Sequence, residues 1–257
     1  MASILIYKAA EEDYDWDYHP ILPRDENSYD CQWITRNPKL STGRWTRVHV
    51  ASELNGKDFN RRFKFFTPPS ADAVDLSVYM DGNIRLLPHF FQAVEPFLLS
   101  GCDFAMFRHP TRNNVLEEIH ACEKHRKFEK GEMERALQRH SDYLATGLDF
   151  ADPIHWCGLI MRRNTNPRLE AMSHWWDEYM QHAKRDQISF PFVAKRHDLK
   201  IFDLSEFFAQ RDIPEAHLYR RYPHRWPRKY GWFRKRREQA KVRLDEFRLR
   251  RSINGYR

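Results

Sequence analysis

Two residues with hard oxygen atoms stand two positions apart in the tripeptide Asp81-Gly82-Asn83. Carboxylate and amide oxygens are the ligands that Mg²⁺ and Mn²⁺ take in proteins, and the glycine between them lets the backbone turn sharply. A divalent cation bound there would offset the negative charge that develops on a diphosphate leaving group. Because Asp-Gly-Asn is also common turn chemistry, the spacing alone fits both a metal site at Asp81 and Asn83 and a plain turn.

Basic side chains precede this turn at Arg61, Arg62 and Lys64. On a strand, alternate residues share a face, so Arg62 and Lys64 would point together and Arg61 would point away. We interpret Arg62 and Lys64 as contacts to a diphosphate group. A solvated polar edge is the alternative for this segment.

Two further pairs of residues could contact a substrate. His109 and Arg112 follow the end of a predicted strand, and an arginine can bind a carboxylate or phosphate through two parallel hydrogen bonds. A plain loop is the alternative for this pair. Asp186 and Gln187 open a predicted helix, where Asp186 is also a favoured N-cap. As a reacting group, Asp186 could be a base, a nucleophile or a ligand of a substrate hydroxyl.

Two adjacent tryptophans, Trp175 and Trp176, lie on a predicted helix, where neighbouring side chains point about 100° apart. The spacing of Leu169, Met172 and Met180 predicts a buried stripe that includes Trp176. Trp175 would then be free to stack on a substrate, although packing in the core is the more ordinary role for both rings.

The elements that must position these residues alternate between strands and helices. Apolar runs predict strands over residues 4–7, 31–35, 74–80, 103–108, 156–161 and 199–202. Helical patterns cover residues 86–99, 115–122, 132–144, 167–183 and 186–194. This alternation predicts an α/β fold, a sheet with helices on its faces, in which ligands bind beyond the carboxyl ends of the strands. Asp81 follows such an end.

The composition is that of a globular protein. Of the 257 residues, 41% are hydrophobic, which is too many for a disordered chain, and no apolar run reaches the ~18 residues needed to span a bilayer. The first residues lack the basic segment, apolar core and cleavage site of a secretory signal, and the four cysteines are scattered. We therefore expect a cytoplasmic protein.

Positive charge is concentrated at the C-terminal end. The formal net charge is +7, yet residues 218–257 hold 15 Lys and Arg against 3 Asp and Glu, while the rest is acidic. We predict a main domain over residues 1–215 and a basic, aromatic, helical extension over residues 216–257. This charge distribution argues against a domain built to coat nucleic acid. The extension could contact an anionic membrane surface, grip an acidic polymer or dock on its own acidic domain.

These motifs together resemble a known family. The stretch 77–85, preceded by residues 61–64, resembles the core motif of the TOD1/MUCI70-like glycosyltransferase family. Further matches follow in the expected order at residues 107–112, 117–118, 121–122, 175–176 and 185–190, so that the resemblance spans about residues 3–205.

The resemblance implies a GT-A-like fold, a Rossmann-type mixed sheet flanked by helices. It also implies a nucleotide-sugar donor, most simply UDP-linked, a glycan or lipid-linked acceptor, and Mn²⁺ or Mg²⁺ held by Asp81 and Asn83. The donor-binding residues carried over are Arg62, Lys64, Asp81, Gly82, Asn83, His109 and Arg112, and the catalytic residues are Asp186 and Gln187.

The sequence departs from the usual metal-binding motif at one position. Asn83 replaces the second aspartate of the usual Asp-x-Asp motif, which leaves metal dependence open, and either His217 or His224 could supply a third ligand. A non-catalytic protein that binds polyanions or a membrane surface is the main alternative. A hydrolase ranks third, because the sequence has neither a G-x-S-x-G nor an H-E-x-x-H motif.

Overall fold

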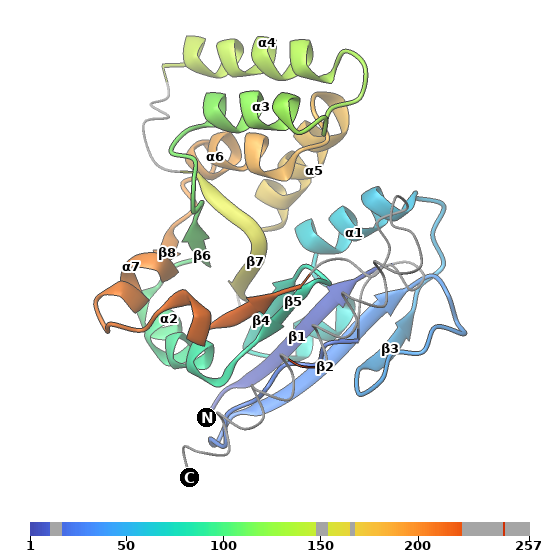
Figure 1. Ribbon diagram of the computed structural model, residues 1–257, viewed down its shortest axis with the longest axis vertical. Helices are drawn as coiled ribbons and strands as arrows, with labels where there is room; N and C mark the ends of the chain where they lie inside the picture. Colours follow the sequence, from blue (N-terminus) through green and yellow to red (C-terminus); the bar gives the residue numbers. More distant parts are fainter. Residues whose placement is uncertain (11–16, 148–153, 165–167, 223–243, 245–257) are drawn as a thin grey trace.

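The protein is a mixed α/β structure built around one seven-stranded sheet (Figure 1). The computed structural model describes residues 1–10, 17–147, 154–164, 168–222 and 244. The sheet has the strand order β3-β2-β1-β4-β7-β6-β8. Its strands are β1 (Ser3–Ala9), β2 (Ser28–Thr35), β3 (Thr46–His49), β4 (Leu76–Met80), β6 (Phe104–Arg108), β7 (His155–Arg163) and β8 (Ile201–Asp203).

Strand direction fixes which loops meet at one edge of the sheet. Strands β1 to β4 are parallel, β6 is parallel to β8, and β7 runs antiparallel to its neighbours β4 and β6. The carboxyl ends of β1, β4 and β6 therefore lie at the same edge as the amino end of β7. Residue 81, which follows β4, lies at this edge.

Both faces of the sheet are buried, because side chains alternate along each strand. On β1, Ile4 and Ile6 enter one apolar cluster, and Leu5 and Tyr7 enter the other. The helices of the first face are α2 (Val94–Ser100) and α7 (Leu204–Ala209), and those of the second are α1 (Gly56–Phe65), α5 (Leu169–Gln181) and α6 (Asp186–Arg196). Helices α3 (Val115–Lys124) and α4 (Glu132–Ala145) form a further layer beyond α6 (Figure 1). The mixed sheet flanked by helices is thus confirmed.

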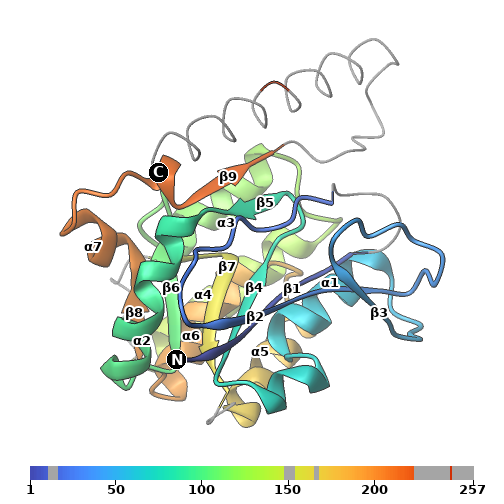
Figure 2. The same ribbon diagram turned by 90° about the horizontal axis from the view of Figure 1, so that it is seen from below.

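A small second sheet pairs β5 (Ile84–Leu86) with β9 (Tyr219–Arg221) in antiparallel register (Figure 2). Strand β9 packs on the main domain just after the predicted boundary at residue 215. From residue 223 onward, apart from Leu244, the predicted basic extension lies outside the described residues. In the described part of the chain, no helix combines the length and apolar character needed to cross a membrane.

Most predicted elements occur near their predicted positions, with two instructive differences. The predicted helix over residues 86–99 begins as a 3-10 segment, Pro88–Ala93, before α2, and Gly101 ends it with a left-handed backbone (φ 72°). The predicted strand at residues 61–64 is wrong, because these residues lie in helix α1. The side chain of Asn55 caps this helix by accepting a hydrogen bond from the backbone N–H of Asp58, a start signal present in the sequence.

Candidate active site

Residues from three distant segments meet at the carboxyl edge of β4. The Nζ atom of Lys64 on α1 lies 3.2 Å from Oδ1 of Asp81 and 2.6 Å from Oδ2 of Asp186 at the start of α6. The side chains of Lys64 and Asp186 are 1% and 7% exposed, whereas that of Asp81 is 30% exposed. One buried ammonium group therefore joins the carboxylate that follows β4 to the carboxylate that opens α6.

Arg61 completes this arrangement, which we call the charged cluster: Arg61, Lys64, Asp81 and Asp186. Its Nε atom lies 3.3 Å from Oδ2 of Asp186. Because α1 is a helix, Arg61 and Lys64 lie three residues apart on one face. The predicted pairing of Arg62 with Lys64 is thus wrong, and Arg62 instead stacks its guanidinium 3.7 Å from the ring centre of Phe66.

Electrostatics keep Asp186 ionised. Burial raises the pKa of Asp186, but the positive charges of Arg61 and Lys64 outweigh it and hold this pKa well below its ordinary value. Burial, with the nearby charge of Asp81, raises the pKa of Tyr79, so its hydroxyl stays protonated and donates to Oδ1 of Asp81 at 2.8 Å. Burial also raises the pKa of Cys157, which makes this thiol a poor nucleophile.

The Asp81-Gly82-Asn83 turn is held from two sides. The backbone N–H of Asp81 donates to the carbonyl of Gly158 on β7 at 2.8 Å. Beyond it, Nδ2 of Asn83 donates to the carbonyl of Tyr222 at 3.1 Å, and the Tyr222 N–H donates back to the Asn83 carbonyl at 2.8 Å. Gly82 is buried, and its φ is not positive. The backbone conformation at this position is therefore not one that requires glycine, contrary to the expectation of a sharp turn.

The turn offers oxygen ligands that suit a hard divalent cation. Asp81 is partly exposed. Nδ2 of Asn83 donates to the Tyr222 carbonyl, so the amide oxygen of Asn83 points away from Tyr222. Mg²⁺ is commonly held by one or two protein carboxylates and completed by substrate phosphates and water. Among the described residues no three His, Cys, Asp or Glu side chains form a metal-binding group, and His217 is exposed, its ring 5.8 Å from that of His89. His224 lies outside the described residues. The donor set therefore fits a cation shared with a phosphate ligand.

The first turn of α6 holds polar side chains without partners. Arg185 is the N-cap residue and makes no side-chain cap, and the carboxylate of Asp186 is engaged by Lys64, so Asp186 is not the N-cap. The Nε2 atom of Gln187 and the Oγ atom of Ser189 are buried and find no hydrogen-bond partner within the described part of the chain. Because buried polar groups are nearly always hydrogen-bonded, this turn is suited to a ligand.

His109 and Arg112 form a separate group after β6. Nη1 of Arg112 lies 2.7 Å from Nε2 of His109, and Nε of Arg112 lies 2.9 Å from Oε2 of the buried Glu118. Burial and the charge of Arg112 lower the pKa of His109 to about 4, so its ring is neutral at pH 7. In the described part of the chain, no hydrogen bond or ion pair joins either residue to the charged cluster.

The burial of the two tryptophans is the reverse of the prediction. Trp175 is fully buried, and its indole Nε1 donates to the carbonyl of Asp186 at 3.2 Å, whereas Trp176 is only half-buried. Leu169 and Met180 of the predicted stripe are 61% and 39% exposed. The predicted face is wrong because the buried side of α5 is set by Ala171, Met172, Trp175, Glu178 and Tyr179.

Other contributors were not predicted from the sequence. Tyr79 orients Asp81, and Lys184 pairs with Asp58 (Nζ to Oδ2, 2.6 Å) to tie the start of α1 to the segment before α6. Tyr79 stands two residues before Asp81 in the matched motif, which is a usable signal. No local signal marks the Lys184–Asp58 pair, because its partners are 126 residues apart.

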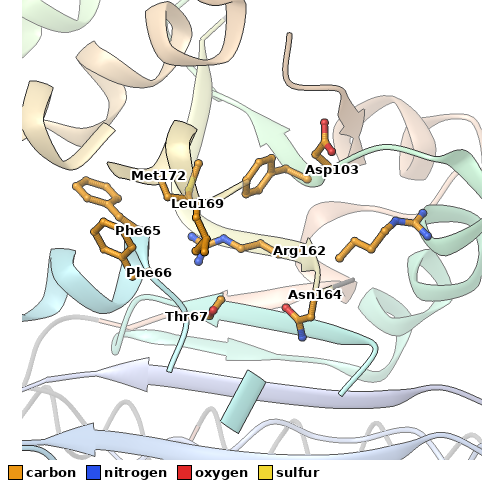
Figure 3. Close-up of a pocket in the computed structure, with 10 residues that line it drawn as sticks. Phe65, Phe66, Thr67, Asp103, Arg162, Asn164, Leu169 and Met172 are labelled. Atoms are coloured by element: carbon orange, nitrogen blue, oxygen red, sulfur yellow. The ribbon is translucent and has the colours of Figure 1, made fainter. Parts of the chain in front are cut away.

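A small cavity lies at the opposite edge of the sheet, by the end of β7 and the start of β6, away from the charged cluster. Figure 3 shows the side chains that line it. It is lined from the end of α1, the start of β6, the end of β7 and the start of α5, and its volume is about 10 Å³. That is room for about one water molecule. Arg162 lines it, and its buried Nε has no hydrogen-bond partner among the residues that the structure describes, so a bound water would satisfy this atom.

Comparison with known proteins bears on the same residues. The TOD1/MUCI70, glycosyltransferase-like domain family matches residues 42–217, a segment that contains the whole charged cluster, the Asp81 turn and the His109–Arg112 group. No curated protein matches the chain. With more than half of its length matched, the chain belongs to the TOD1/MUCI70 family and contains its glycosyltransferase-like domain.

Proposed function

We propose that this protein transfers a sugar from a nucleotide-sugar donor, most simply a UDP-sugar, to a glycan or lipid-linked acceptor, in polysaccharide or surface-glycan synthesis. The observation that carries this proposal is the Lys64 ammonium, which holds Asp81 and Asp186 together although 105 positions separate them in the sequence. The two carboxylates, Asp186 buried and Asp81 partly exposed, lie at the carboxyl edge of an α/β sheet, which is where such a fold places its ligand.

In this proposal the donor diphosphate lies over the Asp81-Gly82-Asn83 turn. Asp81 and Asn83 would hold Mn²⁺ or Mg²⁺ through their oxygens, and the bound cation would offset charge on the leaving diphosphate. Arg61 takes the place first assigned to Arg62, because Arg61 faces the cluster and Arg62 stacks on Phe66. Lys64 orients the two carboxylates, since its ammonium contacts both of them.

Asp186 acts as a fixed negative charge in this scheme. A carboxylate whose pKa lies well below its ordinary value is a weak base, so proton abstraction is not its best role. Placed next to the sugar, it would orient hydroxyl groups and stabilise positive charge that develops at the anomeric carbon. Gln187 and Ser189, whose polar atoms lack partners, would supply hydrogen bonds to the same sugar. His109 and Arg112, which follow β6 at the same edge, would line the acceptor side.

The second candidate is a non-catalytic protein that binds polyanions or a membrane surface through its basic extension. The charge of residues 218–257 supports a contact with an anionic surface, and we propose a peripheral association with the inner membrane surface in addition to transfer. Binding of a polyanion through the extension, however, does not account for the two carboxylates that Lys64 joins at the sheet edge.

A thermal-shift series separates the two candidates. Purified protein is heated with UDP, GDP or CMP and their sugars, each with and without Mn²⁺. A ligand at 100 times its Kd stabilises a protein by about 2.7 kcal/mol. One nucleotide with a metal-dependent shift is expected, and hydrolysis or transfer assays with that donor follow. No shift with any nucleotide, together with salt-sensitive binding to anionic vesicles, would favour the binding protein.

A further inference from the structure

The Asp81-Gly82-Asn83 turn also contacts the last strand of the described chain. Strand β9 pairs with β5, which begins directly after the turn, and the two strands lie side by side in Figure 2. Tyr222 follows β9 and exchanges two hydrogen bonds with Asn83: its N–H donates to the Asn83 carbonyl at 2.8 Å, and its carbonyl accepts from Nδ2 at 3.1 Å. We call Asn83 and Tyr222 the turn clamp. The family match ends at residue 217, so the clamp joins the matched turn to a segment that follows the match.

The turn clamp is anchored on the Tyr222 side. The ring of Tyr222 stacks on that of Tyr18, with ring centres 4.0 Å apart and planes at 25°, and both residues are buried. Pairing of β9 with β5 holds the backbone just before Tyr222, and Ile84 and Leu86 of β5 are fully buried. The carbonyl of Tyr222 is therefore held in place by contacts that do not involve the Asn83 side chain.

This carbonyl decides how the amide of Asn83 is turned. A carbonyl oxygen only accepts hydrogen bonds, so the amide atom that faces it must be Nδ2, and Oδ1 points away from Tyr222. An ionised aspartate at position 83 would have no hydrogen to donate and would place a negative oxygen against the carbonyl. The clamp thus gives a physical reason for asparagine at the position where the usual Asp-x-Asp motif has its second aspartate.

We propose that Tyr222 is a positioning residue for the cation site and acts through Asn83: by holding Nδ2, it presents Oδ1 to the cation that Asp81 also binds. This inference rests on the proposed transferase function, in which Asp81 and Asn83 hold Mn²⁺ or Mg²⁺. The first residue of the turn is fixed as well, because the Asp81 N–H donates to the carbonyl of Gly158 at 2.8 Å. A ligand atom that is oriented before the cation arrives loses less conformational freedom on binding, so the clamp raises the affinity.

The variant Asn83→Asp sets the clamp against simple charge. At an ordinary oxygen site, an added carboxylate strengthens binding of a divalent cation. The clamp predicts the opposite: the affinity for Mn²⁺, titrated by electron paramagnetic resonance with saturating UDP, should fall by about fivefold, as for the loss of one hydrogen bond. Mn²⁺ binding by Asn83→Asp that is as tight as in the wild type, or tighter, overturns the proposal.

The matched control is Asn164→Asp. Nδ2 of Asn164 also donates to a backbone carbonyl, that of Val74 at 3.2 Å, but this asparagine follows β7 at the opposite edge of the sheet. The same chemical change there should lower the Tm and leave the Mn²⁺ affinity unchanged. An equal loss of Mn²⁺ affinity in Asn164→Asp would mean that the loss in Asn83→Asp reflects general destabilisation, and the proposal would be wrong.

Substitutions in the aromatic stack test the anchor. Tyr222→Ala should weaken Mn²⁺ binding by about fivefold, whereas Tyr222→Phe keeps the ring and should bind like the wild type. Tyr18→Ala removes the same stack from the other side, should reproduce the loss, and replaces Tyr222→Ala if that variant does not fold. Tyr29→Ala is the control, because this ring also contacts another aromatic ring, Phe91 at 5.2 Å, but lies at the amino end of β2. Wild-type Mn²⁺ affinity in both stack variants, or an equal loss in Tyr222→Phe, overturns the proposal.

Hydrogen exchange gives a readout that a purely structural contact would not move. If the cation and the clamp share Asn83, each strengthens the other, because coupling between two binding events is reciprocal. Mn²⁺ with UDP should therefore slow exchange of the Tyr222 N–H, which donates to the Asn83 carbonyl, in the wild type and not in Asn83→Asp. Unchanged exchange at Tyr222 in the wild type with Mn²⁺ and UDP bound overturns the proposal.

Mn²⁺ binding by the wild type separates this proposal from the transferase function. If the wild type binds no Mn²⁺ with UDP, GDP or CMP, the cation assignment of the proposed function fails, and the positioning role fails with it. If the wild type binds Mn²⁺ while Asn83→Asp and Tyr222→Ala bind it as tightly, only the positioning role is wrong. Weaker binding in both variants, with wild-type binding in Tyr222→Phe, is the expected result.

Discussion

Two buried carboxylates on neighbouring helices, Asp186 on α6 and Glu178 on α5, have similar electrostatics and different surroundings. Burial raises the pKa of each, and neighbouring groups outweigh it: Arg61 and Lys64 at Asp186, and hydrogen bonds from Arg139 and Tyr143 at Glu178. Both carboxylates therefore have a pKa below the ordinary value and remain ionised at neutral pH.

The difference lies in whether the surrounding groups are satisfied. Glu178 accepts hydrogen bonds from Arg139 and Tyr143, and His174 and His182 lie 3.4 and 3.7 Å from its oxygens. In the first turn of α6 with Asp186, by contrast, Nε2 of Gln187 and Oγ of Ser189 have no hydrogen-bond partner among the described residues, and the cluster continues to the partly exposed Asp81. A buried carboxylate whose neighbouring polar atoms are all hydrogen-bonded has a structural role. Buried polar atoms without a partner indicate a ligand-binding site.

The largest effect is expected for Asp81→Ala. Transfer should fall by about 1000-fold or more, equivalent to about 4 kcal/mol in transition-state stabilisation, because the leaving diphosphate loses its cation ligand. The free energy of unfolding should change by only about 1 kcal/mol, since Lys64 keeps Asp186 as a partner. Steady-state transfer and urea unfolding measure the two effects, with the exposed Asp72→Ala as control. Full transfer by Asp81→Ala would remove the site assignment.

Glu178→Ala should show the opposite pattern. Removing one partner of a buried ion pair costs about 3–5 kcal/mol, because Arg139 is left without its carboxylate. Urea unfolding should report this loss, while the Kd of the folded protein for its nucleotide stays within about threefold of the wild type. A large loss of nucleotide affinity in the folded variant would mean that the Glu178 group belongs to the site, and the comparison would fail.

The tryptophan pair sharpens the comparison at the level of packing. Trp175→Ala should destabilise the protein by about 3–5 kcal/mol, because it empties a fully buried position and removes the hydrogen bond to Asp186. Trp176→Ala should cost clearly less, since that side chain is only half-buried. Equal unfolding free energies for the two variants would contradict the observed face of α5.

The smallest effect concerns acid unfolding. A carboxylate with a lowered folded pKa contributes stability that is complete above its unfolded pKa of about 4 and is lost as pH falls toward the folded pKa. Wild-type stability should therefore decline below about pH 4. Asp186→Asn and Glu178→Gln should each make this decline shallower, measured as unfolding free energy between pH 5 and pH 2 in urea, pH values chosen to bracket the ordinary carboxyl pKa of about 4. An unchanged slope in Asp186→Asn would show that Asp186 is not held ionised by Arg61 and Lys64.

Local patterns in the sequence predicted most of the large sheet. Apolar runs located β1, β2, β4, β6 and β7, and the helical patterns over residues 86–99 and 115–122 located α2 and α3. Strands β3 and β9 were not predicted, because neither contains an apolar run. Helix α1 was missed where alternating basic residues suggested a strand, although Asn55 and Asp58 marked its start.

By itself, the sequence determined the alternation of strands and helices, the family, and the Asp81 turn at the end of a buried strand. Only the tertiary structure decided which arginine accompanies Lys64. Residues 61–64 lie in a helix and not in a strand, so Arg61 is the partner of Asp186, whereas Arg62 stacks on Phe66. It also decided that Lys64 joins two carboxylates and that, within the described part of the chain, Nε2 of Gln187 and Oγ of Ser189 are buried without a hydrogen-bond partner. These properties depend on contacts between segments more than 100 residues apart, whose distances no local pattern encodes.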